Sequence, residues 1–358
     1  GILKPEKDVP DWSDVSAAAE RVRGRVRRTP VIESLALNQI AGRRVFVKAE
    51  CLQWTGTFKF RGALNRILCL LSLKNNADKW AGTKKSEDVD DNGIGVIAFS
   101  SGNFGQGLAA AATSLGVKST IVMPADAPKA KQDRAKLYGA TVALSPVVPG
   151  INREVTAAEM AASCAAEEGL HLLHPFEDRD VIAGQGTAAL ELAQELKDQG
   201  VEELGAVMVP TGGGGLVAGS ALALERLMPS TRVYAVEPEG YADHLTSLAE
   251  QKIVPLKDSP FSLCDALQAV SPGMRSFEIN RRLLEGAVAV SDKEVAKAME
   301  VAFETMSLVL EPSGACGLAA VISGKIPVRE GEAVAVIASG GNITMQKFAA
   351  AMGCHGKF

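Results

Sequence analysis

Short apolar runs alternate with longer amphipathic stretches along most of the chain. The short runs are rich in β-branched residues and end in small or turn-forming residues, as strands do. They lie at 45–50, 95–101, 119–125, 141–146, 170–175, 206–212, 232–238 and 333–341. Alanine-rich stretches with helical spacing lie at 103–115, 128–138, 152–168, 186–199 and 214–227. This alternation predicts an α/β fold of open, mostly parallel sheets with helices on both faces.

Two further segments refine this organisation. The sequence "SDKE" at 291–294 predicts a capping box at the start of a helix, because serine and glutamate at this spacing satisfy backbone donors reciprocally. The segment 73–93 is polar and highly charged, which predicts an exposed insertion or a mobile connection. At 358 residues the chain exceeds one ordinary core, so two domains or one large α/β domain are expected.

The composition argues against several classes of partner. Apolar residues make up 47% of the chain, charged residues 22%, and the net charge is −4, so neither nucleic acid nor an anionic membrane surface is expected to bind. The apolar runs are shorter than the roughly 20 residues of a membrane span, and no signal peptide is visible. The six cysteines are scattered, as in a reducing compartment. A cytoplasmic location is therefore expected, or an organelle if a transit peptide has been removed.

The stretch "PTGGGGLVAG" at 210–219 reads as a strand, a glycine run and a helix. Without Cβ atoms, the backbone N–H groups of the run can turn around an anion, and the helix that follows adds the positive end of its dipole. The glycines that would form this phosphate site are Gly212, Gly213, Gly214 and Gly215. A plain flexible turn is the simpler alternative.

A dinucleotide site is a second interpretation of the same run. Gly213, Gly215 and Ala218 satisfy G-x-G-x-x-A, and Glu237 ends the next strand about 20 residues later. No G-K-[ST] follows, which excludes a nucleotide-binding loop of the Walker type.

The stretch "TGTFKFRG" at 55–62 places Lys59 between Phe58 and Phe60. Aromatic neighbours would partly desolvate the amine and lower its pKa toward that of a usable nucleophile and base. A lysine on the solvent side of a helix is the alternative. Together with a phosphate site, a desolvated lysine indicates pyridoxal phosphate.

Six ordered motifs extend this hypothesis to the whole chain: "TGTFKFRGALN", "SSGNFGQG", "HPFEDRDVIAGQGT", "PTGGGGL", "EPSGACGLAA" and "SGGN". In this order they resemble the motifs of the threonine/serine dehydratases and serine racemases, which are fold type II (β-family) pyridoxal phosphate enzymes. The resemblance runs from about residue 12 to 343. It implies a tryptophan synthase β-like fold in which 1–65 plus 171–358 form the large cofactor-binding domain and 66–170 form a small inserted domain.

The resemblance also implies the cofactor contacts. Lys59 would form the Schiff base with the cofactor aldehyde. The other implied contacts are Phe58 at the ring, Asn103 at the 3′ oxygen, Gly212 to Gly215 at the phosphate, and Ser339 at the pyridine nitrogen. The neutral hydroxyl of Ser339 cannot keep that nitrogen protonated as an aspartate would. Rapid loss of a β-substituent is then favoured over a long-lived carbanion.

Two serines are implied to contact the substrate. Ser100 and Ser101 open the helix predicted at 103–115 and would bind the substrate carboxylate, or they would simply cap that helix. Ser101 also matches the residue that, in the racemases, protonates Cα on the face opposite the lysine. Phe104 stands where the family usually has histidine, which leaves the substrate open.

A divalent cation is implied beside the cofactor domain. Glu237 and Asp243, with the carbonyl of Tyr241 between them, match the acidic pair that binds Mg²⁺ or Ca²⁺ in racemase-like members, and hard oxygen ligands suit those ions. Two surface carboxylates on a loop are the alternative. The four histidines show no metal-binding spacing, and His174 is expected to be structural.

The resemblance therefore implies a dehydratase or ammonia-lyase that acts on a small β-hydroxy amino acid of the serine, threonine or 3-hydroxyaspartate type. Its product would be a 2-keto acid, and Lys59 and Ser101 would be its catalytic residues. Racemisation of an amino acid on the same site is the first alternative, and an NAD-binding oxidoreductase is an alternative of another class. A homodimer is expected.

Overall fold

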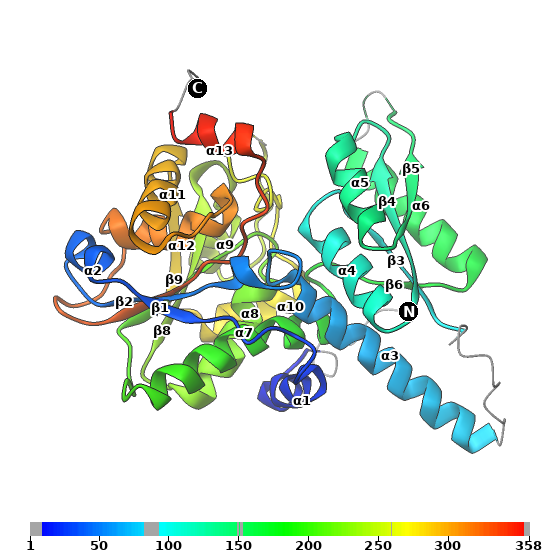
Figure 1. Cartoon of the computed structure of the whole chain (residues 1–358), viewed down its shortest axis with the longest axis horizontal. Helices are drawn as coiled ribbons and strands as arrows, with labels where there is room; N and C mark the ends of the chain where they lie inside the picture. The colour runs from blue at the N-terminus through cyan, green and yellow to red at the C-terminus, as the bar shows by residue number, and fades with distance from the viewer. Residues whose placement is uncertain (1–8, 82–92, 149, 151–152, 259, 354–358) are drawn as a thin grey trace.

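The structure is a computed structural model that describes residues 9–81, 93–148, 150, 153–258 and 260–353, without the side chains of 76–81. Two bodies lie side by side, each built on its own sheet (Figure 1). The larger sheet has the strand order β1-β2-β10-β7-β8-β9, and the smaller sheet has the order β5-β4-β3-β6. Every pairing between these described strands is parallel except that of β1 with β2. The predicted α/β class with mostly parallel sheets is confirmed.

The strands are short, and their bounds follow the β-branched runs. The larger sheet contains β1 (Val31–Glu33), β2 (Val45–Lys48), β7 (Ala206–Pro210), β8 (Arg232–Pro238), β9 (Gly286–Val290) and β10 (Val334–Ile337). The smaller sheet contains β3 (Gly95–Phe99), β4 (Lys118–Pro124), β5 (Thr141–Ser145) and β6 (His171–Leu172). Several predicted strands end earlier than expected, because residues 173–175, 211–212 and 338–341 form loops at the carboxyl ends of the sheets.

Helices cover both faces of each sheet. They are α1 (Trp12–Val22), α2 (Leu35–Ala41), α3 (Lys59–Ala81), α4 (Asn103–Ser114), α5 (Lys129–Leu137), α6 (Arg153–Glu168), α7 (Arg179–Asp198), α8 (Gly215–Leu227), α9 (Asp243–Glu250), α10 (Met274–Leu283), α11 (Asp292–Met306), α12 (Pro312–Ile322) and α13 (Met345–Ala351). Short 3₁₀ turns lie at Glu50–Leu52 and Glu239–Tyr241. Among the described helices, none combines the length and the apolar character needed to cross a bilayer.

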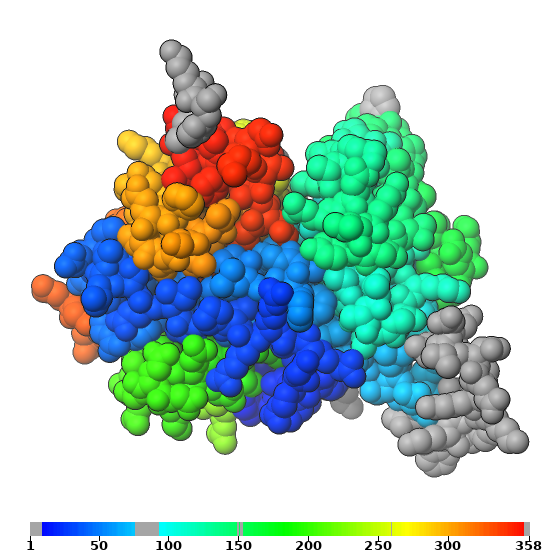
Figure 2. Space-filling view, viewed as in Figure 1, coloured from blue at the N-terminus to red at the C-terminus, as the bar shows by residue number. Residues whose placement is uncertain are grey.

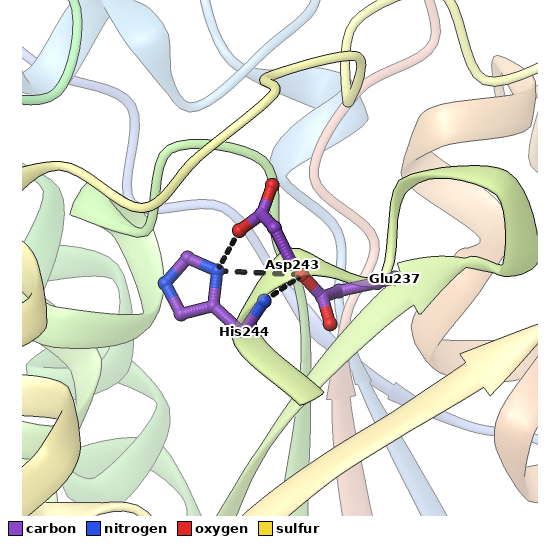
Figure 3. Close-up of side chains that lie close together, drawn as sticks. All are labelled: Glu237, Asp243 and His244. Carbon is purple, nitrogen blue, oxygen red and sulfur yellow. Dashed lines mark hydrogen bonds and ion pairs between the residues drawn. The ribbon is translucent and has the colours of Figure 1, made fainter. Parts of the chain in front are cut away.

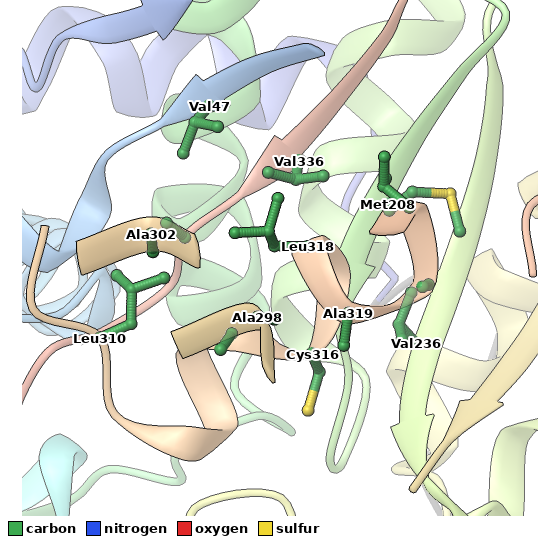
Figure 4. Packing of buried hydrophobic residues seen from close by; sticks show 14 of the residues in the cluster. Val47, Met208, Val236, Ala298, Ala302, Leu310, Cys316, Leu318, Ala319 and Val336 are labelled. Atoms are coloured by element: carbon green, nitrogen blue, oxygen red, sulfur yellow. The ribbon is translucent and has the colours of Figure 1, made fainter. Parts of the chain in front are cut away.

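The larger body has a core on each face of its sheet. On one face, strand residues such as Val47 and Val336 pack against Ala298 of α11 and Leu318 of α12 (Figure 4). On the other face, α7 and α8 pack under the same strands with α1. The burial of both faces explains why β2, β7 and β10 read as continuous apolar runs rather than as alternating ones.

Three details of the sequence prediction are settled by the helices. The capping box is confirmed, since Ser291 and Glu294 each accept the other's backbone N–H at the start of α11. Helix α7 begins at Arg179, not at 186, because Asp178 caps it by accepting the N–H groups of Asp180 and Val181. Residues 73–81 continue α3 and are not a connection. The rest of the predicted insertion lies almost entirely outside the described residues.

The division into two domains remains our proposal, with one adjustment. Strand β6 at 171–172 pairs with β3 of the smaller sheet, so we place the boundary after 172 rather than after 170. Helix α3 extends from the larger body along the smaller one (Figure 1). A notch separates the two bodies on the face seen in Figure 2, between the red C-terminal residues and the cyan to green segment.

Candidate active site

Lys59 is the first residue of α3 and is held against the end of β10. The Phe58 N–H donates to the carbonyl of Ser339 (3.1 Å), and Thr57 forms a β-bridge with Gly340. Ser339 itself is buried. These contacts place the start of α3 at the carboxyl edge of the larger sheet, where ligands bind in parallel α/β folds.

The Lys59 amine lies in a largely apolar setting. Its Nζ donates to the carbonyl of Pro175 (3.2 Å) and lies 5.0 Å from the ring centre of Phe58 and 5.8 Å from that of Phe104. Burial lowers the pKa of Lys59 to about 8, opposed by the negative charge of Glu311. The expectation that Phe60 flanks the amine is not met: Phe60 lies in the core of the smaller body, and Phe104 takes that place.

The glycine run joins β7 to α8, and neighbouring side chains pack closely against it. A Cβ on Gly213 would lie 2.3 Å from the ring of Phe176, and Gly214 has a φ of +94° and would meet His244. The Gly213 carbonyl accepts from the Gly273 N–H (3.0 Å) and from the Ser276 hydroxyl (2.7 Å). A residue with a side chain would therefore clash at Gly213 or Gly214. The Gly213 carbonyl already accepts two hydrogen bonds.

The segment 174–176 connects the amine to the glycine run. Pro175 accepts the Lys59 bond, and the next residue, Phe176, packs on the glycines. His174 Nδ1 accepts the Glu177 N–H (3.1 Å), and burial, together with Lys59 and Arg275, lowers the pKa of His174 to about 4. His174 is thus neutral and engaged with backbone, in keeping with the structural role expected from the sequence.

Asn103 links the two bodies at this site. Its amide Nδ2 donates to Glu311 Oε1 (2.7 Å), and its Oδ1 accepts from Asn342 Nδ2 (2.9 Å). Glu311 is 5% exposed, and burial with the nearby charge of Asp265 raises its pKa to about 8. Sequence reasoning quoted the motif "EPSGACGLAA" but assigned Glu311 no role. The sequence feature that could have indicated Glu311 is its position, directly before Pro312 at the start of an apolar helix.

Ser100 and Ser101 lie in the loop between β3 and α4, and both are partly exposed. The Ser100 hydroxyl accepts the Gly102 N–H (3.2 Å). Gly102 is the N-cap of α4 and lacks a side-chain cap, so these serines do not occupy the N-cap position that the alternative interpretation gave them. Helix α4 packs closely on Lys59, since a Cβ on Gly107 would lie 3.1 Å from the Lys59 carbonyl carbon.

Arg61, two residues after the lysine, is fully buried. Its guanidinium makes two bonds to Glu50 (2.7 and 2.8 Å) and two to Glu191 (2.8 and 2.7 Å). Lys48 Nζ also contacts Glu191 (2.8 Å). This buried group of two cations and two carboxylates attaches the first turn of α3 to β2, the Glu50–Leu52 turn and α7. The sequence did not reveal it, because its members lie far apart along the chain.

A second cluster lies behind the glycine run. Glu237, Asp243 and His244 are all buried, and their side chains converge (Figure 3). Burial would lower the pKa of His244, but the two carboxylates outweigh it and raise this pKa to about 9. Burial raises the pKa of Asp243 to about 6. Tyr241, the third predicted ligand, is buried in the turn between them, and its hydroxyl donates to the carbonyl of Pro260 (2.9 Å).

Comparison with known proteins places this geometry in a family. Residues 22–340 match the family described as pyridoxal-phosphate dependent enzyme. The chain belongs to this family. It is 39% identical to the L-threo-3-hydroxyaspartate ammonia-lyase of a Pseudomonas species (94% of this chain, 97% of that one) and 36% identical to the serine racemase of Arabidopsis thaliana (95% of each). The structure of maize serine racemase superposes with a TM-score of 0.82 at 32% identity (97% of this chain and 98% of that one covered).

Membership of this family supports pyridoxal phosphate as the cofactor. The match gives no support to the dinucleotide interpretation of Gly213, Gly215 and Ala218, and the run stays the predicted site of the cofactor phosphate. Two features of the structure agree with this: the run leads into the N-terminus of α8, and the segment 174–176 contacts both the run and the buried amine of Lys59. The resemblance to fold type II enzymes stated from the motifs is confirmed.

Proposed function

We propose that this enzyme removes water and then ammonia from a small β-hydroxy amino acid, releasing a 2-keto acid. The observation that carries the proposal is the position of Ser339, which follows β10 and accepts the N–H of Phe58, the neighbour of Lys59. Its neutral hydroxyl would face the pyridine nitrogen, where a carboxylate would keep that nitrogen protonated. Relatives named as ammonia-lyase and threonine dehydratase support it. When bound, pyridoxal phosphate supplies an electron sink for the charge left on Cα.

The residues of the chain would hold the cofactor, bind the substrate and transfer the proton. Gly212 to Gly215 and the N-terminus of α8 would hold the phosphate, and Asn103 would contact the 3′ oxygen while Glu311 and Asn342 fix its amide. Ser100 and Ser101, with the N-terminal N–H groups of α4, would bind the substrate carboxylate. Phe58 would pack against the ring. Lys59 Nζ, with its lowered pKa, would take the proton from the substrate Cα.

The test is a substrate panel. Purified enzyme is incubated with the L and D forms of serine, threonine and 3-hydroxyaspartate, and the release of keto acid and ammonia is followed. Equal amounts of both from at least one substrate are expected, and Lys59→Ala should abolish them. A panel in which no substrate releases keto acid would refute the proposal.

Racemisation is the second candidate, supported by relatives named as serine racemase. Inversion needs a proton donor on the face opposite the lysine, and Ser101, in the loop that leads into α4, is the residue that the resemblance gives this role. Ser101→Ala should therefore suppress formation of the D isomer more than release of keto acid. If the parent forms D isomer faster than keto acid, racemisation is the main reaction.

We also propose a divalent cation at Glu237 and Asp243, a homodimer and a cytoplasmic location. From oxygen ligands alone, Mg²⁺ or Ca²⁺ is the expected ion, with the Tyr241 carbonyl completing the set. Light scattering of the purified protein tests the dimer, and fluorescence microscopy of the tagged protein in its own cells tests the location.

A further inference from the structure

The cluster behind the glycine run contains a group that the expected oxygen site does not use. His244 is 0% exposed, and its Nδ1 points at the two carboxylates (Figure 3). Nδ1 lies 2.9 Å from Asp243 Oδ1 and 3.3 Å from Glu237 Oε1. In this position, Nδ1 could bind an ion that lies between the two carboxylates.

These two contacts are close enough to be ion pairs, yet neither has the geometry of a hydrogen bond. Neither oxygen of Asp243 nor Nδ1 of His244 has a hydrogen-bond partner among the described residues, although Asp243 is only 1% exposed. Buried polar atoms left without partners cost about 1–3 kcal/mol each, so each calls for an explanation. The three atoms make ion-pair contacts but no hydrogen bonds with one another, and they are arranged around a common point.

The spacing of the three atoms fits ligands of one metal ion. First-row ions bind nitrogen and oxygen at roughly 2.0–2.2 Å, which separates neighbouring ligand atoms by about 2.9–3.5 Å. The two measured separations fall in this interval. Glu237 is held in place, since its two oxygens accept the N–H groups of His244 (2.8 Å) and Leu245 (2.9 Å), and each oxygen retains a lone pair.

The far side of the imidazole supports the same assignment. His244 Nε2 lies 3.2 Å from Asn280 Nδ2, and Asn280 Oδ1 has no hydrogen-bond partner among the described residues. If Nδ1 binds a metal, the ring proton is on Nε2, and turning the Asn280 amide over lets Oδ1 accept it. Metal-bound histidines are usually held by such an acceptor on their second nitrogen.

We propose that Glu237, Asp243 and His244 form a mixed nitrogen and oxygen site that binds a first-row transition ion, such as Co²⁺ or Zn²⁺, in preference to Mg²⁺ or Ca²⁺. Imidazole raises affinity for the later first-row ions, whereas Mg²⁺ and Ca²⁺ select oxygen. The other edge of the ring lies against Gly214, so the bound ion also fixes a wall of the phosphate loop. The inference deepens the proposed cation site and does not depend on which amino acid the enzyme acts on.

Metal binding to the cofactor-loaded, chelator-treated full chain tests this directly. Titration calorimetry should give a dissociation constant for Co²⁺ and Zn²⁺ that is lower than that for Mg²⁺ by roughly tenfold or more. His244→Asn keeps both carboxylates and should remove most of this preference while changing Mg²⁺ affinity little. His171→Asn is the matched control, because it removes an exposed imidazole elsewhere and should leave the preference intact.

A spectroscopic measurement on the parent protein avoids dependence on any variant. Pulsed electron paramagnetic resonance with one equivalent of Mn²⁺ should show coupling to an imidazole ¹⁴N, and this coupling should persist in His171→Asn. Absence of the coupling, an unchanged preference in His244→Asn, or no binding of any of these ions would overturn the proposal. In the last case the cluster is an internal ion triad. None of these readouts requires turnover, so they are independent of the substrate panel.

Discussion

At the scale of single residues, the site depends on two buried groups that titrate in the same range. Burial lowers the pKa of Lys59 to about 8 and raises that of Glu311 to about 8. The ionised carboxylate of Glu311 favours the ammonium form of Lys59. The charge of Glu311 therefore acts on the pKa of Lys59. The chemistry of the lysine depends on whether Glu311 carries a charge.

This coupling predicts how cofactor uptake depends on pH. Only the unprotonated amine of Lys59 reacts with an aldehyde, so association of pyridoxal phosphate with the apoenzyme should accelerate as pH rises, with a midpoint about 8. In Glu311→Gln the negative charge that stabilises the ammonium is absent, so the midpoint should move to lower pH. Stopped-flow absorbance measures both rates.

Glu300→Gln serves as the control, because Glu300 is a solvent-facing acid on α11 that pairs with Lys297. It should reproduce the midpoint of the parent. A midpoint that does not move in Glu311→Gln would show that this carboxyl remains neutral throughout the titration of Lys59.

At the scale of elements, the start of α3 is fixed by Arg61. Burial alone would raise the pKa of Glu50, but Arg61 and Lys48 outweigh it and lower that pKa. A carboxylate whose pKa is lowered by folding stabilises the folded state above its unfolded pKa. This stabilisation is lost as pH falls through the folded pKa. The buried group around Arg61 should thus be a point of acid sensitivity.

Arg61→Met should lower the free energy of unfolding by about 3–5 kcal/mol, because Glu50 then remains buried without its main cation. Urea unfolding at neutral pH measures the loss. The variant should also lose less stability than the parent between neutral and acid pH, since the Glu50 pKa is no longer held low. A parent and a variant with parallel acid transitions would contradict this.

The close packing of the glycine run between β7 and α8 leads to a prediction about cofactor binding. Gly213→Ala should weaken pyridoxal phosphate binding strongly, because its Cβ would enter the ring of Phe176 and displace the loop from the end of β7. Gly286→Ala in β9 is the matched control: its Cβ would lie at an ordinary 3.6 Å from Tyr234. Cofactor affinity by fluorescence titration should fall in the first variant and stay unchanged in the second. Equal affinities would show that the loop adapts.

The elements also show where the sequence was informative. Four glycines between a strand and a helix have few structural uses, so the loop before α8 was predictable. The start of α7 was not, because Gly184 and Gly186 weaken a helical pattern. They are required there, since a Cβ on Gly184 would lie 2.7 Å from the Cα of Gly62, and one on Gly186 would meet the Gly219 carbonyl. Close approach of helices is a tertiary fact with no local signal, and the same holds for the partners of Glu311.

At the scale of the whole molecule, few polar contacts between described residues join the two bodies over the site. Asn103 of the smaller body bonds Glu311 and Asn342 of the larger one. Nearer to solvent, Lys131 of α5 lies 3.5 Å from Asp265, in the loop before α10. Asp265 also acts on Glu311, whose pKa it raises, whereas Lys131 lowers that pKa. The same ion pair therefore both joins the two bodies and affects the charge of Glu311 at the site.

Substituting either Lys131 or Asp265 distinguishes the contact between the bodies from the effect on the pKa of Glu311. Asp265→Asn and Lys131→Gln each remove the contact, so both should raise KM by up to about fivefold, the limit for a pair that is partly exposed. Their effects on Glu311 have opposite signs: losing the acid lowers its pKa, and losing the lysine raises it. The pH midpoint of cofactor uptake should therefore move in opposite directions in the two variants, while their KM values change together. Added salt should raise KM in the parent and have little further effect in either variant. If only one variant changes KM, the contact does not hold the bodies together, and that residue acts on the substrate by itself.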